Sequence, residues 1–206
     1  ASGTAEALPG IWGSRAEYIW AVGEARTLTH FDATAWTARL AGSDVGGVPV
    51  ALQAVWGSGP SDVWAVGEAG TVLHFDGATW LPSASGVTQT LNAVWGNGSA
   101  EAWAVGFNGT VVHWDGAAWS STATDVHQPL SSVWESEAGD VWAVGGAGTS
   151  LRWDGSAWLD VPSGTSESLF GVWGSGSELW ASGANGTLLH FASSQWQAVS
   201  AGTTQY

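Results

Sequence analysis

The chain has 206 residues, no Cys, Met or Lys, and a net charge of −14 from 18 acidic residues against four arginines. These values exclude disulfides and thiolate metal sites, and they disfavour binding to nucleic acid or anionic lipid, because phosphate groups require a positive surface. No run approaches the roughly 18 apolar residues of a membrane-spanning helix, so we expect no membrane insertion.

Tryptophan repeats along the chain with a regular spacing. The first of each set is Trp12, Trp56, Trp95, Trp134 and Trp173, at intervals of 44, 39, 39 and 39 residues. Two further sets follow the same spacing: Trp20, Trp64, Trp103, Trp142 and Trp180, then Trp36, Trp80, Trp119, Trp158 and Trp196. A period near 40 residues is typical of solenoids and propellers.

The elements of one copy are clearest between residues 52 and 83. Short runs rich in β-branched and aromatic residues occupy 52–56, 62–66, 71–75 and the stretch from 79, separated by turns rich in Gly, Ser and Asp. Such runs predict strands, and the Asp76-Gly77 pair predicts a hairpin. Each copy is therefore expected to be a four-stranded antiparallel meander.

In chain order, we expect blades at residues 8–40, 52–83, 91–122, 130–162 and 169–200. The predicted fold is all-β: a single five-bladed β-propeller domain with four antiparallel strands per blade. An open β-solenoid is the alternative, but its coils are usually shorter, at about 20–30 residues. Tryptophan side chains are expected to fill the space between neighbouring blades.

Two sets of polar residues recur in the copies. One position of the repeat carries His30, His74, His113, Arg152 and His190. Because Arg replaces His in one copy, we predict that these side chains share a role as hydrogen-bond donors to a backbone carbonyl or a carboxylate. A ring of metal ligands is disfavoured, since Arg does not bind metal ions. The same five residues are the alternative, inter-blade binding site. The acids Glu17, Asp62, Glu101, Asp140 and Glu178, with Asp32, Asp76, Asp115 and Asp154, are predicted to cap turns.

Positions that differ between copies are better candidates for ligand binding. At the start of the innermost strand stand Gln53, Asn92, Ser131 and Phe170, near the predicted axis and the long connections between blades. Those connections carry Asp44, Asp125, His127 and Glu167. We expect an axial ligand site formed by Gln53, Asn92, Ser131, Phe170, Asp125 and His127.

The motif W-G-S-G-x-x-D-V-W-A-V-G-x-x-G-T-x-x-H-F-D-G-x-x-W, at 56–80, recurs with changes at 95–119 and 134–158. It resembles the tandem repeats of large secreted bacterial β-propeller proteins and is loosely similar to BNR or Asp-box repeats. Five blades are also similar to tachylectin-2-like lectins, although no sugar-site motif is shared. The resemblance implies the propeller architecture and an extracellular or cell-surface location, and it leaves the activity open.

The sequence lacks a serine nucleophile elbow, an H-E-x-x-H motif and a phosphate-binding loop, so we expect a protein without enzymatic activity, cofactor or metal. The leading hypothesis is a monomeric, multivalent module that binds carbohydrate, because aromatic and glycine-rich loops suit sugar stacking. The alternative is a protein-interaction or surface-scaffold propeller whose tryptophans are all used in the core. A hydrolase with an axial pocket containing Asp125 and Glu167 is a third hypothesis.

Overall fold

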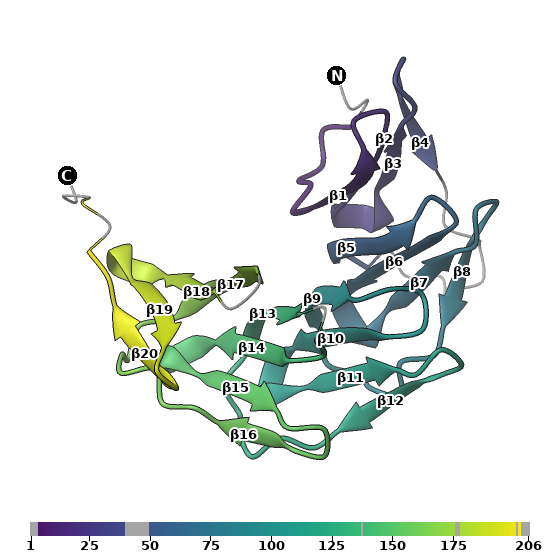
Figure 1. Cartoon of the computed structure of the whole chain (residues 1–206). Helices are drawn as coiled ribbons and strands as arrows, with labels where there is room; N and C mark the ends of the chain where they lie inside the picture. The colour runs from purple at the N-terminus through teal and green to yellow at the C-terminus, as the bar shows by residue number, and fades with distance from the viewer. Residues whose placement is uncertain (1–3, 40–49, 137, 176–177, 201, 203–206) are drawn as a thin grey trace. The chain divides into compact units, whose positions relative to one another are not determined.

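The computed structural model describes residues 4–39, 50–136, 138–175, 178–200 and 202. These residues form five antiparallel sheets of four strands each, and in every sheet the strands follow one another in chain order (Figure 1). The predicted all-β fold class, with five four-stranded antiparallel sheets that resemble propeller blades, is confirmed. Within the part of the chain that the structure describes, no helix has the length and apolarity needed to cross a membrane.

The strands have the following bounds. The first sheet contains β1 (Gly10–Arg15), β2 (Tyr18–Val22), β3 (Leu28–Phe31) and β4 (Trp36–Arg39). The second contains β5 (Leu52–Gly59), β6 (Asp62–Gly67), β7 (Val72–Phe75) and β8 (Trp80–Ser83). The third contains β9 (Leu91–Gly96), β10 (Ala102–Gly106), β11 (Val111–Trp114) and β12 (Trp119–Thr122). The fourth contains β13 (Leu130–Glu135), β14 (Val141–Gly145), β15 (Ser150–Trp153) and β16 (Trp158–Asp160). The fifth contains β17 (Leu169–Ser175), β18 (Glu178–Gly183), β19 (Leu188–Ala192) and β20 (Gln195–Ala198).

The second and third strands of each sheet are joined by a single 3-10 turn. These turns are η1 (Glu24–Arg26), η2 (Glu68–Gly70), η3 (Phe107–Gly109), η4 (Gly146–Gly148) and η5 (Ala184–Gly186). Three of these turns are held by a hydroxyl from the connection that leads to the next sheet. The hydroxyl donates a hydrogen bond to the carbonyl of the last glycine in the turn: Ser85 to Gly70 at 2.7 Å, Thr124 to Gly109 at 2.8 Å and Ser163 to Gly148 at 2.6 Å. The three connections that contain Ser85, Thr124 and Ser163 are therefore ordered by local hydrogen bonds.

The chain divides into two compact units. One comprises Ala1–Ala104 and Val112–Ser121, and the other comprises Val105–Val111 and Thr122–Tyr206. The first unit holds the first two sheets and most of the third, and the second unit holds the fourth and fifth sheets.

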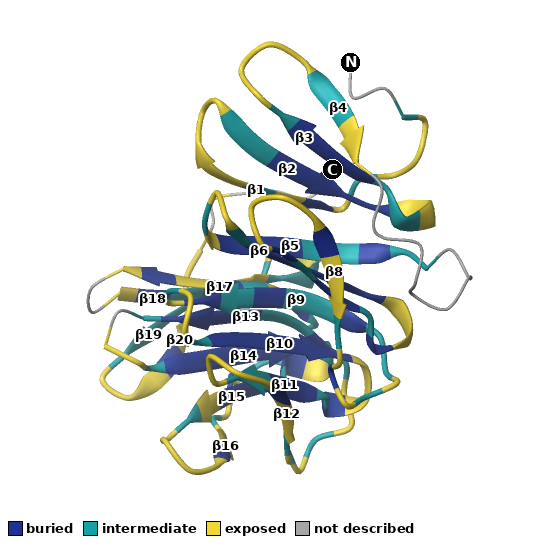
Figure 2. Cartoon of the chain, turned by 90° about the vertical axis from the view of Figure 1, so that its right-hand side faces the viewer, coloured by how far each residue is buried: buried dark blue, intermediate teal, exposed yellow. Residues whose placement is uncertain are grey.

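Tryptophans of the second strands join adjacent sheets within each unit. Trp20 of β2 meets the ring of Trp80 edge-on, with centroids 5.1 Å apart. Trp64 of β6 meets Trp119 in the same way at 5.2 Å, and in the second unit Trp142 of β14 meets Trp196 at 5.6 Å. Edge-to-face rings are the favoured arrangement of aromatic pairs. Figure 2 shows the resulting burial along the central strands, with exposed residues at the hairpin tips.

The four hairpin aspartates cap their turns as predicted. Asp76 Oδ1 accepts hydrogen bonds from the backbone N–H groups of Ala78 and Thr79, both at 2.8 Å. In the same way, Oδ1 of Asp32, Asp115 and Asp154 accepts hydrogen bonds from the backbone N–H groups of the residues two and three positions later in the chain. Hydrogen bonds to the charged form lower the pKa of each carboxyl, and that of Asp32 falls from 3.8 to about 2, with the Thr34 hydroxyl as the largest cause.

We expect the fold to lose stability as the pH falls from about 4 towards about 2. A carboxyl whose pKa is lowered by folding stabilises the folded state fully at pH values above its pKa in the unfolded chain. This stabilisation is lost as the pH falls through the lower pKa of the folded state, where the group becomes protonated. Urea unfolding measured across this range should show a weaker pH dependence in Asp76→Asn, which keeps an acceptor for the turn but does not titrate. The control is Asp160→Asn on β16, and equal slopes for Asp76→Asn and the unchanged protein would contradict the expectation.

Candidate functional site

An acidic residue, an indole and a His or Arg side chain lie together in most sheets. On β6, Asp62 and Trp64 are two residues apart and so share one face of the strand. Trp64 pairs directly with His74 on β7, which brings the imidazole over the same face. The spacing of the repeat therefore assembles a carboxylate, an indole and a donor at the beginning of the second strand or one residue before it.

Distances within this cluster of an acid, an indole and a His or Arg are similar from sheet to sheet. Nε2 of His74 and of His190 each lie 2.7 Å from a carboxylate oxygen, of Asp62 and Glu178 respectively. Nη2 of Arg152 lies 2.6 Å from Asp140 Oδ1, and Nε of the same arginine lies at 3.2 Å. His113 Nε2 lies 3.3 Å from Glu101 Oε1, which is an ion-pair distance without hydrogen-bond alignment.

The ring stacking also repeats. His74, His113 and His190 stack on Trp64, Trp103 and Trp180, with centroids 4.0, 4.1 and 4.3 Å apart. Arg152 takes the same place 5.7 Å from the ring of Trp142. The predicted contact with a carboxylate is present for His74, Arg152 and His190. It is not formed as a hydrogen bond by His113 or His30. The prediction that Asp62, Glu101, Asp140 and Glu178 cap turns is wrong in its main point, because their carboxylates lie against the His or Arg side chain of the next strand. Asp62 also accepts a hydrogen bond from the Ser58 hydroxyl in its turn.

The first sheet departs from this pattern. Tyr18, two residues before Trp20, occupies the position of the acid, so the assignment of Glu17 to the acidic set is wrong by one residue. The Tyr18 hydroxyl instead donates to the carbonyl of Pro60 at 2.6 Å. With no carboxylate opposite, His30 Nε2 is buried without a hydrogen-bond partner among the described residues. Burial, and then the charge of Arg39, lowers the pKa of His30 below its ordinary value.

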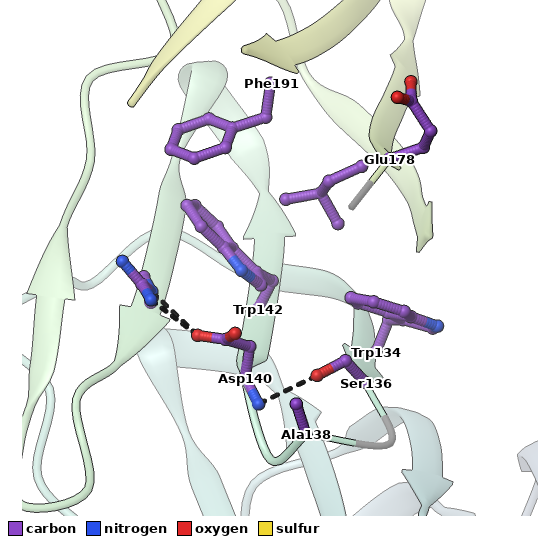
Figure 3. A pocket seen from close by; sticks show the side chains of 9 residues that line it. Trp134, Ser136, Ala138, Asp140, Trp142, Glu178 and Phe191 are labelled. Carbon is purple, nitrogen blue, oxygen red and sulfur yellow. Dashed lines mark hydrogen bonds and ion pairs between the residues drawn. The ribbon is translucent and has the colours of Figure 1, made fainter. Parts of the chain in front are cut away.

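A cavity of about 210 Å³ lies between the fourth and fifth sheets of the second unit (Figure 3). Its walls are the rings of Trp134, Trp142 and Phe191, and the Asp140–Arg152 ion pair lies at its edge. Arg152 is thus the one member of the alternative inter-blade set that lines this cavity. The cavity is smaller than the roughly 300–1,000 Å³ of typical small-molecule sites, so it fits an inserted side chain better than a free ligand.

The predicted axial residues lie at strand irregularities. Gln53, Ser131 and Phe170 are each skipped by the pairing of β5, β13 and β17, as at a β-bulge, and a bulge re-aims the side chain. Gln53 lines a cavity of about 450 Å³ in the first unit, together with Pro9, Glu24 and Glu68. Asn92 starts the neighbouring strand β9, which contacts β5.

The other predicted axial residues lie in the second unit. Phe170 is exposed at the start of β17, and Asp125 and His127 are exposed in the connection before β13. Glu167 Oε2 accepts a hydrogen bond from Asn185 Nδ2 at 2.7 Å, which ties its connection to η5. Asp44 lies outside the described residues. An axial ligand site therefore stays a prediction, as does the hydrolase hypothesis that used Asp125 and Glu167.

Sequence reasoning missed the exposure of Trp173. The equivalent residues Trp56 and Trp134 are 6% and 7% exposed, whereas Trp173 is 57% exposed. A signal was present in the same sheet, because the valine of V-W-A-V-G is replaced by Ser182 in the fifth copy. Val66, Val105 and Val144 at that position are fully buried, and Ser182 is exposed.

Comparisons with known proteins support the fold. No protein-family model matches the chain, and no curated protein matches it. The described residues contain no group of three His, Asp or Glu residues that could hold a metal ion. The chain is similar to a solved structure of YCF48 bound to D1 peptide, with a TM-score of 0.73 and 20% identity over 96% of this chain and 68% of that one. It is also similar to YCF48 from Cyanidioschyzon merolae, with a TM-score of 0.69 and 18% identity over 99% and 71% of the two chains.

Proposed function

We propose that the protein is a non-enzymatic interaction module that binds a protein partner through a segment rich in Arg and Lys. The observation that carries this proposal is the similarity of the fold, over nearly the whole chain, to a YCF48 propeller bound to a peptide. At 20% identity this similarity establishes the fold, and the transfer of peptide binding is our inference.

The charge of the chain supports a basic partner. Eighteen acids against four arginines surround the sheets with negative potential, which attracts cationic segments and raises their association rate. One of the four arginines also has its charge balanced locally, because Arg152 pairs with Asp140. Little positive charge remains to oppose a basic partner.

The use of the tryptophans supports a protein partner over a sugar. Carbohydrate recognition needs open indoles for stacking, but Trp20, Trp64 and Trp142 are wedged against the next sheet and almost fully buried. The repeated, equivalent sugar sites of the leading sequence hypothesis would need these rings. Carbohydrate binding remains the second candidate, and the exposed rings of Phe107 in η3 and Trp173 in β17 are the features that favour it.

A peptide array tests the proposal. Immobilised peptides rich in Arg and Lys should retain the labelled chain, while neutral and Asp- or Glu-rich peptides of equal length should not. Raising the ionic strength from about 0.05 M to about 0.5 M should weaken binding by about tenfold or more, because the attraction is largely electrostatic. If the labelled chain bound to a glycan array at millimolar sugar and no class of peptide retained it, the proposal would be wrong and carbohydrate binding would be the better explanation.

A further inference from the structure

In the first unit, an additional aromatic ring fills the space beside the indole of each second strand. Between the first and second sheets this ring is Tyr18, which meets Trp20 edge-on with centroids 6.4 Å apart and packs against the buried cluster that contains Trp20 and Phe75. Its hydroxyl reaches across to the carbonyl of Pro60, between β5 and β6, at 2.6 Å. Tyr18 thus bridges the two sheets.

The second and third sheets solve the same problem from the other side. Asp62 stands two residues before Trp64, where the first sheet has Tyr18, so the earlier sheet supplies no extra ring here. The later sheet instead supplies a larger one, because Trp114 stands where the second sheet has Phe75. The rings of Trp64 and Trp114 have centroids 4.8 Å apart. Each of these two gaps therefore holds either a tyrosine or a second tryptophan.

The gap between the fourth and fifth sheets has neither. Asp140 occupies the tyrosine position and Phe191 occupies the position of Trp114. The cavity of about 210 Å³ lies at this place, and both residues line it (Figure 3). All of its lining residues belong to the second unit, so one unit forms its walls. In the register of the repeat, the cavity is the space that a Tyr or Trp ring fills in the first unit.

The walls of the cavity suit an aromatic ring with a polar atom. Trp134, Trp142 and Phe191 provide ring faces and edges, against which a further ring packs favourably. An apolar cavity of about 150 Å³ is already large enough for benzene, so this one can take a single phenol or indole ring. At the edge, Arg152 binds Oδ1 of Asp140, which leaves Oδ2 to accept a phenol O–H or an indole N–H.

We infer that this cavity receives one Tyr or Trp side chain of the partner's basic segment. This inference rests on the proposed function and names the contact that gives it specificity. An aromatic side chain buried in a pocket is the usual energetic centre of a protein interface. The charged residues that line the cavity are two acids, Asp140 and Glu178, and one arginine, which suits Arg or Lys residues on either side of the aromatic anchor.

The test observes a peptide by ¹⁹F NMR in the presence of the full, unlabelled chain. The probe is a capped nonapeptide with four Arg residues around a central 5-fluorotryptophan, so only the peptide gives a signal. Its resonance should shift in a saturable way as the chain is added. Replacing the central residue of the peptide by Ala should weaken binding, measured by calorimetry, by about tenfold. This comparison needs no variant of the protein.

Phe191→Trp blocks the cavity by supplying the ring that Trp114 provides in the third sheet. It should weaken binding of the aromatic peptide by about tenfold, to the level of the Ala peptide, and should raise the thermal midpoint because it fills a void. The matched control is Phe75→Trp, the same substitution at the same position of the repeat. There Tyr18 already fills the space, so the control should lower the midpoint by overpacking and leave binding unchanged.

The outcomes separate the inference from the proposed function. Equal affinities of the aromatic and Ala peptides would overturn the inference and leave the binding of basic segments standing. Full affinity of the aromatic peptide for Phe191→Trp, in a variant whose midpoint has risen, would show that the ring binds elsewhere and would also overturn the inference. Failure of both Arg peptides to bind would overturn the inference and the proposed function together.

Discussion

Replacing Gly67 by Ala is expected to lower the free energy of unfolding by about 3 kcal/mol or more. A Cβ at this position would overlap the carbonyl oxygen of Ala51 and would lie 2.9 Å from Leu52 Cα. Both are backbone atoms, so no side-chain rotation can relieve the contact. Glu68 N–H donates to that same Ala51 carbonyl at 3.0 Å, so moving the segment away would also break a hydrogen bond.

The matched control for Gly67→Ala is Gly59→Ala at the end of β5. A Cβ at Gly59 meets no heavy atom within 4 Å, so the change should stay within about 0.5 kcal/mol. For a chain of this length, the difference corresponds to a separation of about 6–12 °C in thermal midpoint, measurable by calorimetry. Similar midpoints for the two variants would show that the connection at Ala51 is not held against Gly67 in solution.

The sequence predicted the sheets well because each copy repeats the same physical requirement. An indole on the second strand must fill the space beside the next sheet, so Trp20, Trp64 and Trp142 recur in register with the strands they occupy. The Asp-Gly turns were equally readable, since an aspartate that accepts two local N–H groups is a property of four or five consecutive residues. Local and periodic constraints of this kind are visible without a structure.

The chemistry of the acidic positions was harder to read, because it depends on which face of a strand a side chain occupies. Grouping Glu17 with Asp62 matched the residue type but ignored that Tyr18, two residues before Trp20, shares the indole's face. Counting by two from the tryptophan would have found Tyr18. It would also have placed Asp62 toward His74 rather than into its turn.

Exposure of the fifth sheet could not be predicted from the repeat. A repeat motif assigns the same role to Trp56 and Trp173, yet the first is 6% exposed and the second 57%. Trp56 lies against the next sheet, where a Cβ built on Gly96 would be 2.7 Å from its indole. In the sequence, this difference in exposure is accompanied by Ser182, which stands where the other copies have valine. A single change from valine to serine is easily interpreted as ordinary variation between copies.

Trp56 and Trp173 offer a matched pair for measuring that difference. Trp56→Ala is expected to lower the free energy of unfolding by about 3–5 kcal/mol, because it opens a large void between the second and third sheets of the first unit. Trp173→Ala removes the same side chain from the same position of the repeat, but its ring is 57% exposed and the cost should stay below about 1 kcal/mol. Urea unfolding followed by circular dichroism measures both without relying on tryptophan fluorescence.

Equal costs for the two variants would mean that the Trp173 ring is covered in solution. Repeating the measurement over a wide range of protein concentration would then identify the cause, because cover supplied by a second copy weakens on dilution and raises the apparent stability with concentration. A low cost for Trp173→Ala, independent of concentration, leaves the indole free.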